Sequence, residues 1–207
     1  MIPPRILVAG IAPEPVRAAF VAAGVQAWSA NEFPSRDGGP HIQAPVLDTI
    51  RRGWDVIIMR PDFVALTLSG NWCYGRGGRD EAERGAQMRT AMREWKAAKV
   101  HAYIGCALEF PTSVLLARLG REVGVQYLQP YMFGHPESKR TGLALYYLPR
   151  LTATNDVRAE MRRLPRVERE RVLMMTPSED RRALRAEPYP GVANAMAIQW
   201  ANLRRIQ

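Results

Sequence analysis

The sequence predicts an α/β protein of Rossmann-like architecture, with a central, mostly parallel sheet and flanking helices. Short apolar segments at residues 5–10, 25–29 and 54–59 have the composition of strands, and the last is apolar on both faces. Helical patterns separate these segments, which is typical of a parallel sheet built from β-α-β-α-β connections. The chain has 207 residues, 47% of them hydrophobic, so residues 1–207 are expected to form a single domain.

The other elements follow from apolar periodicity and from the positions of proline and glycine. Residues 13–23 are predicted to be helical, because two prolines suit the first turn and four apolar side chains recur on one face. Residues 31–40 and 71–79 are predicted to be loops, the first rich in proline and glycine and the second in glycine and arginine. Further helices are expected at residues 47–52, 80–99, 113–119 and 192–205, and further strands at residues 100–105, 126–129 and 142–147.

Residues 156–187 differ in composition from the rest of the chain. Arginine and carboxylate side chains are dense there and large apolar side chains are few, so we expect an arginine-rich helical or mobile excursion from the domain. Three glutamates would neutralise part of the arginine charge, so a solvated helix is the alternative to a phosphate-binding surface. The candidate arginines are Arg158, Arg162, Arg163, Arg166, Arg169 and Arg171.

The formal net charge of the chain is +9, from 29 Lys and Arg against 20 Asp and Glu. A basic surface favours an anionic partner, most often nucleic acid, because neutralising phosphates releases counterions. We therefore expect DNA or a nucleotide as partner, with a basic but indifferent surface as the alternative. The sequence contains no signal for the oligomeric state.

Cysteine and histidine usage narrows the class of protein. Cys73 and Cys106 form neither a disulfide framework nor a metal-binding pair, and the three histidines are scattered, so we predict no metal. Residues 1–5 lack the pattern of a signal peptide, and no apolar run approaches the ~20 residues that cross a bilayer. We therefore expect a cytoplasmic protein without membrane contact.

The densest group of reactive side chains lies in residues 129–139. His135, Glu137, Ser138 and Lys139 fall within five residues, and a predicted strand follows them. A histidine near a carboxylate can have its pKa tuned toward neutrality, so this block is a candidate for proton transfer or phosphate binding. The alternative is a loop held together by local hydrogen bonds.

Several motifs, in this order and spacing, resemble phage-encoded DNA methyltransferase-like proteins of the cytosine carbon-5 type. The likeness extends over most of the chain. It implies a Rossmann-like methyltransferase fold, S-adenosylmethionine as the ancestral cofactor, DNA as partner and the cytoplasm of an infected bacterial host as location. The motifs are residues 27–29, 41–43, 46–48, 53–58, 69–72, 129–139 and 189–200.

The chain departs from this family at the positions that would hold the cofactor. The resemblance assigns cofactor contacts to Gly10, Asn31 and Glu32, but two prolines after Gly10 remove amide donors. Asn31 stands where the family has an acidic residue for the ribose hydroxyls, and Glu32 is its neighbour. Residues 44–45, Ala and Pro, replace a Gly-Asp pair. We therefore expect no cofactor, with S-adenosylmethionine only if this pocket still functions.

The chain also departs from the family at the nucleophile. The resemblance places a His-Pro-Pro-Cys loop where this sequence has Arg60, a proline, Asp62 and Phe63. A phenylalanine ring cannot add to a pyrimidine, so base methylation by that covalent route is not expected. Asp62 is a candidate acid or base, or else a partner of Arg60 or a turn cap. Glu109 matches a family carboxylate that contacts the base.

A glycine- and arginine-rich loop is the candidate nucleic-acid contact outside the cleft. Arg76 and Arg79 lie near Trp72 and Tyr74, so phosphates can meet cations while bases stack on rings. The alternative is a flexible glycine loop. The full set predicted to contact nucleic acid is Arg60, Arg76, Arg79, Ser138 and Lys139.

These observations predict a phage methyltransferase-like protein that does not methylate and that binds DNA or nucleotides in the ancestral cleft. One alternative is an active S-adenosylmethionine-dependent DNA methyltransferase with remodelled motifs. Another is a protein-binding pseudoenzyme, either a partner subunit or an inhibitor of host defence. The residues predicted to carry any remaining chemistry are Asp62, Glu109, His135, Glu137 and Lys139.

Overall fold

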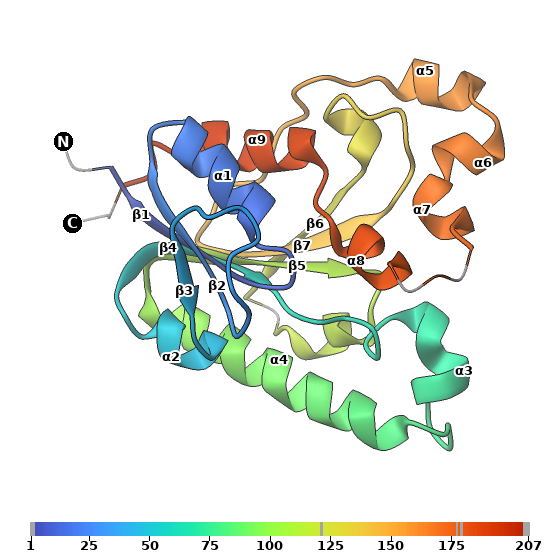
Figure 1. The fold of residues 1–207 in the computed structure, drawn as a ribbon, viewed down its shortest axis with the longest axis horizontal. Helices are drawn as coiled ribbons and strands as arrows, with labels where there is room; N and C mark the ends of the chain where they lie inside the picture. The colour runs from blue at the N-terminus through green and yellow to red at the C-terminus, as the bar shows by residue number, and fades with distance from the viewer. Residues whose placement is uncertain (1–2, 121, 177, 179, 205–207) are drawn as a thin grey trace.

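The computed structural model describes residues 3–120, 122–176, 178 and 180–204. Within them the chain forms a seven-stranded sheet in the order β3-β2-β1-β4-β5-β7-β6 (Figure 1). β1 to β5 pair in parallel, and β7 runs antiparallel to both β5 and β6. The predicted α/β class and mostly parallel sheet are confirmed. The strands are β1 (Arg5–Gly10), β2 (Gln26–Asn31), β3 (His41–Gln43), β4 (Trp54–Arg60), β5 (Ala102–Pro111), β6 (Gly124–Leu128) and β7 (Thr141–Tyr146).

Helices cover both faces of this sheet (Figure 1). α1 and α9 pack together on one face, and α2 and α4 lie on the other. The helices are α1 (Glu14–Ala22), α2 (Val46–Ile50), α3 (Asn71–Tyr74), α4 (Glu81–His101), α5 (Arg158–Arg163), α6 (Arg166–Arg169), α7 (Arg171–Met174), α8 (Arg181–Ala186) and α9 (Pro190–Trp200). Short 3₁₀ turns occur at η1 (Leu68–Gly70), η2 (Val114–Arg118) and η3 (Pro130–Met132).

Two apolar clusters explain why the central strands are buried on both sides. Alternate side chains of β1 and β4 point to opposite faces, so Ile6 and Val56 join one cluster while Leu7 and Ile57 join the other. Trp200 of α9 closes the first cluster. Trp95 of α4 closes the second. Fully burying one Val, Leu, Ile, Phe or Met side chain contributes about 1.5–3 kcal/mol to stability. The two clusters therefore hold both helical layers onto the sheet.

The prediction of individual elements was wrong at three places. Residues 71–79 contain the short helix α3, because Asn71 to Tyr74 close one helical turn before the glycines begin. Residues 100–101 end α4 instead of starting a strand; Val100 is 77% exposed, so its apolar character does not mark a buried strand. The edge strand β3 was not predicted, since its three residues are too few for a periodic pattern.

Residues 156–187 form the four short helices α5 to α8, as far as they are described; residues 177 and 179 lie outside the description. Prolines interrupt the helical run, and Pro165 separates α5 from α6. α5 to α7 lie along the outer side of the molecule, whereas α8 lies close to the sheet (Figure 1).

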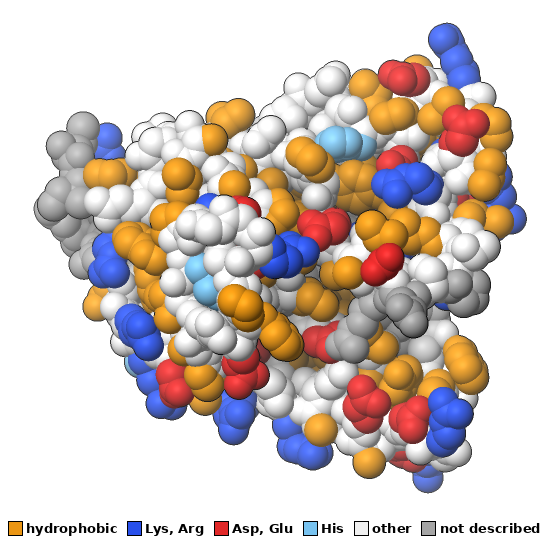
Figure 2. All heavy atoms as spheres, viewed as in Figure 1, with side chains coloured by type: hydrophobic (Ala, Val, Ile, Leu, Met, Phe, Trp, Pro, Cys, Tyr) orange, Lys and Arg blue, Asp and Glu red, His pale blue; other side chains and the backbone are white. Residues whose placement is uncertain are grey.

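The visible surface carries its charges unevenly. In Figure 2, Lys and Arg gather along the edge over α2 and the adjoining part of α4, whereas basic and acidic side chains are mixed near α3 and α5 to α7. Arg51 and Arg52, which follow α2, are both exposed. Among the described residues, no helix combines the length and the apolarity that crossing a membrane requires.

The strand order defines where a ligand would bind. From β1 the chain runs outward to β2 and β3, then returns to β4 on the other side of β1 and continues to β5. Open α/β sheets bind ligands outside the carboxyl ends of the strands at such a switch point. The carboxyl ends of β1 and β4 are therefore the place to look for a site.

Candidate functional site

A cavity of about 440 Å³ lies at the carboxyl ends of β4 and β5. Arg60 ends β4, Glu109 lies in β5, and Lys139 precedes β7; all three line the cavity. α8 contributes Arg181 and Arg185. Small-molecule sites commonly enclose about 300–1,000 Å³, so the cavity has room for a small organic ligand.

Arg60 is the most connected side chain of the site, and it is only 4% exposed. Its Nε and Nη2 donate to the Glu109 carboxylate at 3.1 and 3.4 Å. Its Nη1 donates to the carbonyl oxygen of Ile11 at 2.9 Å and to that of Ala12, and Nη2 also donates to the Ala186 carbonyl at 2.8 Å. Arg60 thus ties the turn after β1, strand β5 and the end of α8 to one another.

Lys139 is the member of the 135–139 block that lines the cavity. Its Nζ donates to the Arg185 carbonyl at 2.8 Å and lies 5.5 Å from the centre of the Tyr189 ring. Burial lowers the pKa of Lys139, while the nearby Glu109 carboxylate acts in the opposite direction. The ammonium group therefore holds α8 and is only partly available to a ligand.

His135, Glu137 and Ser138 do not line this cavity, so the prediction that the whole block forms one cleft with Arg60 was wrong. His135 Nε2 accepts from the Gly191 N–H at 2.9 Å, at the start of α9. Glu137 accepts from Arg171 at 3.0 Å and from the Tyr189 hydroxyl at 2.9 Å. The polar groups of the block form hydrogen bonds with residues of α7 and at the start of α9, so the block joins these segments. Any catalytic role of these residues stays a prediction.

Asp62 and Phe63 both line the cavity, as their position after β4 predicts. Asp62 Oδ1 accepts from the Val64 N–H at 3.1 Å, which is the turn-capping role considered from the sequence. Phe63 presents only carbon atoms where the resemblance places a nucleophilic thiol. The nearest cysteine in sequence, Cys73, is buried and hydrogen-bonded to Asp80 at 3.0 Å.

Arg76 and Arg79 lie outside the cavity, in the loop that follows α3. Arg79 pairs with Asp80 at 3.3 Å, and its side chain is 80% exposed. Trp72 in α3 is 83% exposed. The structure therefore leaves this cationic and aromatic group open to solvent, on the same side of the molecule as α8 (Figure 1).

Two of the three predicted cofactor residues, Gly10 and Asn31, contact each other. The Asn31 amide donates to the Gly10 carbonyl at 3.1 Å and accepts from the Phe33 N–H at 2.9 Å. Glu32 is exposed, and neither it nor Asn31 lines the cavity. One amide N–H and one lone pair of the Asn31 oxygen are therefore already used by the backbone.

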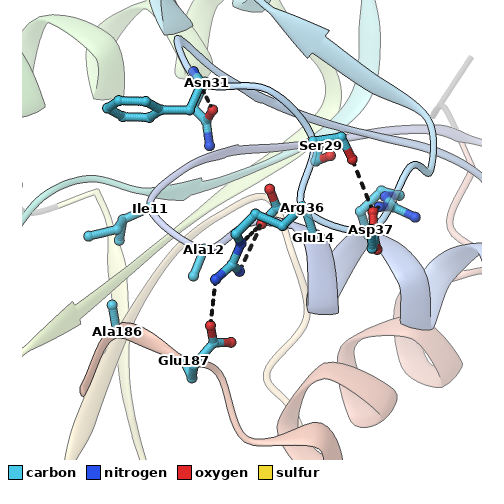
Figure 3. A network of polar contacts seen from close by, with 12 residues as sticks. Ile11, Ala12, Glu14, Ser29, Asn31, Arg36, Asp37, Ala186 and Glu187 are labelled. Atoms are coloured by element: carbon cyan, nitrogen blue, oxygen red, sulfur yellow. Dashed lines mark hydrogen bonds and ion pairs between the residues drawn. The ribbon is translucent and has the colours of Figure 1, made fainter. Parts of the chain in front are cut away.

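Side chains also cross the space beside the turn after β1. Figure 3 shows Arg36 between Glu14 and Glu187, with ion pairs of 3.0 and 2.7 Å. Glu14 is 3% exposed, and Arg36 is its ion-pair partner. Together with the Asn31 contacts, this network means that the residues present do not fit S-adenosylmethionine at the predicted position.

Sequence reasoning missed two parts of the site. Arg181 and Arg185 are four residues apart on α8, a spacing that places two side chains on one helix face and that the sequence does display. The Arg36–Glu187 ion pair joins residues 151 positions apart, and no local pattern reports such a contact. The arginine pair on α8 could have been found from the sequence, whereas the Arg36–Glu187 ion pair could not.

We expect His135 to make the protein less stable as the pH falls. Burial lowers the pKa of His135 below its ordinary value of 6.5, so the unfolded chain takes up this proton first. The stabilising contribution is therefore complete above about pH 6.5 and declines as the pH falls through that value toward the folded-state pKa. Urea unfolding from about pH 7 to about pH 5 should show a smaller decline for His135→Gln than for the wild type.

His101→Gln, at the end of α4, is the matched control for the loss of one histidine. Groups common to all three proteins cancel in the comparison, including Glu94, whose pKa burial raises to about 7. An identical pH dependence in the wild type and His135→Gln would contradict this assignment.

Comparisons with known proteins support the fold only. No protein-family model matches the chain, and no curated protein matches it. Among solved structures, the Entamoeba histolytica methyltransferase EhMeth aligns with a TM-score of 0.50 and 10% identity, over 73% of this chain and 57% of that one. This likeness is consistent with the Rossmann-like α/β fold described above.

Two further solved structures have lower scores. A protein described as a DNA modification methyltransferase encoded within a prophage (E. coli) gives a TM-score of 0.47 at 8% identity, over 68% of this chain and 46% of that one. The S. pombe Dnmt2 methyltransferase gives 0.46 at 11% identity, over 71% and 50%. The chain thus spans about half the length of the structures it matches.

Proposed function

We propose that this chain is a methyltransferase-like protein that does not methylate and that binds DNA or a nucleotide in the cavity beside β4 and β5. One contrast carries the proposal. The cavity at the ends of these strands is open, whereas the adjoining space after β1 is crossed by the Arg36–Glu14–Glu187 network. In the family, the methyl acceptor binds on the side of this cavity and the methyl donor binds beside the turn after β1. A cavity that is open on the acceptor side, next to a filled donor side, suits ligand binding better than methyl transfer.

The loss of methylation rests on chemistry at two positions. Phe63 supplies no lone pair for attack on a base. The Asn31 amide donates to the Gly10 carbonyl, so this donor and this acceptor are already paired with each other where the family contacts its methyl donor. Phage origin and location in a bacterial host belong to the same proposal and follow from the resemblance of the motifs.

Nucleic acid is favoured over other ligands by charge. The chain carries a formal charge of +9, and the cavity is lined by four basic and two acidic side chains, an excess of two positive charges. Exposed Trp72, with Arg76 and Arg79 close by in sequence, offers a ring for stacking and cations for phosphates on the side where α8 lies. These features together fit a nucleic-acid strand better than a neutral ligand.

Fluorescence anisotropy with labelled single- and double-stranded DNA, over a series of salt concentrations, tests this proposal. We expect binding whose logarithmic affinity falls linearly with the logarithm of salt concentration, with a slope that reflects the number of phosphates neutralised. The double variant Arg76→Gln/Arg79→Gln should lose about tenfold or more in affinity and reduce that slope by about one to two. Arg51→Gln/Arg52→Gln removes the same charge from the edge near α2 and should lose much less.

Failure of the wild type to bind DNA at low salt, or binding indifferent to salt, would contradict the proposal and favour a protein partner. Equal losses in the two double variants would contradict the placement of the strand near α3. Calorimetry with S-adenosylmethionine and its demethylated product should give no binding at micromolar protein. Micromolar affinity for either would favour an active methyltransferase with remodelled motifs.

A further inference from the structure

α8 directs two arginines into the cavity. Arg181 and Arg185 are separated by one helical turn, so their side chains lie on the same face of α8, and both line the cavity. The end of α8 is held in place by two cations, since Arg60 donates to the Ala186 carbonyl and Lys139 to the Arg185 carbonyl, each at 2.8 Å. These bonds fix the backbone of α8, the helix from which both arginines reach the cavity.

Neither guanidinium has a partner among the described residues. Arg181 Nε is buried and makes no hydrogen bond there. The neighbouring Arg60 is the opposite case, because its three nitrogens bind a carboxylate and three carbonyl oxygens. Buried donors are nearly always satisfied, so the Arg181 Nε–H in the cavity wall is a donor that an acceptor on a bound ligand would satisfy.

Electrostatics point to an anion. The pKa of Arg185 is lowered by burial and by the positive charge of Arg181, so these two cations repel each other. Of the acidic groups that line the cavity, Glu109 is paired with Arg60. That ion pair involves neither Arg181 nor Arg185. A doubly charged anion between the two guanidinium groups would remove the repulsion and satisfy the unpaired N–H.

The rest of the lining is apolar and aromatic. Phe63, Phe110 and Pro111 line the same cavity as the two arginines. An aromatic ring offers a stacking surface for a base. A guanidinium group binds phosphate through two parallel N–H donors. The ligand that combines a planar apolar part with a phosphate is a nucleotide.

We propose that Arg181 and Arg185 form a phosphate-binding clamp, so that the ligand of the cavity is a nucleotide held by its phosphate on α8 with its base against Phe63. This inference rests on the proposed function and specifies its ligand. The same phosphate chemistry is offered by a free 5′-mononucleotide and by a phosphodiester in a DNA strand, and the experiment below separates these sources.

Calorimetry should measure the affinity of the wild type for the four deoxynucleoside 5′-monophosphates, the corresponding nucleosides and a short single-stranded oligonucleotide. We expect a phosphorylated ligand to bind at least about tenfold more tightly than its nucleoside. Arg181→Gln and Arg185→Gln should each weaken that binding about tenfold or more. Arg181→Lys keeps the charge but loses the planar fork, so its affinity should lie between those of the wild type and Arg181→Gln. Arg93→Gln on α4, an exposed arginine that lines no part of the cavity, is the matched control and should bind as the wild type does.

Circular dichroism and thermal unfolding establish that each variant is folded before its affinity is compared. Tight binding of a mononucleotide identifies a free nucleotide as the ligand, and binding of the oligonucleotide alone identifies a strand. If nucleotides or DNA bind but the two glutamine variants match the wild type, the clamp is disproved while the proposed function stands. If the wild type binds none of these ligands, both proposals fail.

Discussion

Replacing Arg60 with methionine is expected to lower the free energy of unfolding by about 3–5 kcal/mol, the usual cost of removing one partner of a buried ion pair. Arg60 is 4% exposed, and its loss leaves the Glu109 carboxylate without its cation. It also leaves the carbonyl oxygens of Ile11, Ala12 and Ala186 without this donor. Urea unfolding followed by circular dichroism measures the change.

The variant Arg60→Met/Glu109→Met separates the two parts of this cost. Replacing both members of a buried ion pair with apolar groups is often nearly neutral, so some stability should return. The return should be incomplete, because the three carbonyl oxygens still lack the Arg60 donors. Arg166→Met, which removes an ion pair whose arginine is 71% exposed, is the control and should cost no more than about 0.5 kcal/mol. A loss for Arg60→Met as small as that control would show that Arg60 does not hold the site together.

The sequence predicts this site best where parallel strands end. Arg60 and Asp62 follow a strand recognisable from its continuous apolar run, and Glu109 lies in the adjacent strand. Carboxyl ends of parallel strands meet at one edge of the sheet, so these residues were expected to lie together, and they do line one cavity. Their placement at one edge follows from strand identity and direction alone, whereas the roles assigned to these residues stay predictions.

Prediction failed where the contact is set by how distant segments fold back. The density of polar groups around His135 indicated a cleft, but these groups hydrogen-bond the first turn of α9 and the Arg171 side chain. The return of α8 to the cavity depends on the Arg60 and Lys139 bonds to its carbonyl oxygens. Backbone acceptors carry no residue identity, so no sequence pattern reports those bonds.

Gly10 illustrates how one residue can keep a family position while its role changes. The resemblance assigns Gly10 to close approach of a cofactor, but in this structure the close approach is to the protein itself. The Ile11 N–H donates to the Arg60 carbonyl at 2.6 Å. A Cβ atom on Gly10 would lie 2.1 Å from that same carbonyl oxygen. The glycine is therefore required for β1 and β4 to stay paired up to the site.

We expect Gly10→Ala to destabilise the protein by more than about 3 kcal/mol, because two penalties combine. Gly10 has φ of +116°, a conformation that alanine adopts only with strain, and the new methyl group would overlap the Arg60 carbonyl. Thermal and urea unfolding measure the change. DNA binding by any folded fraction should also weaken, since moving Arg60 displaces the anchor of α8.

Gly24→Ala separates the two penalties. Gly24 also has a positive φ, +76°, but nothing lies within 4 Å of a Cβ placed there. Its substitution should cost only the backbone strain, about 1–2 kcal/mol. The additional loss in Gly10→Ala then measures the overlap with Arg60. Equal losses at the two positions would mean that β4 yields to the methyl group, and that the turn after β1 has room the structure does not show. In that case the turn after β1 could move to admit a ligand. The crowding seen beside this turn would then no longer argue against a nucleoside there.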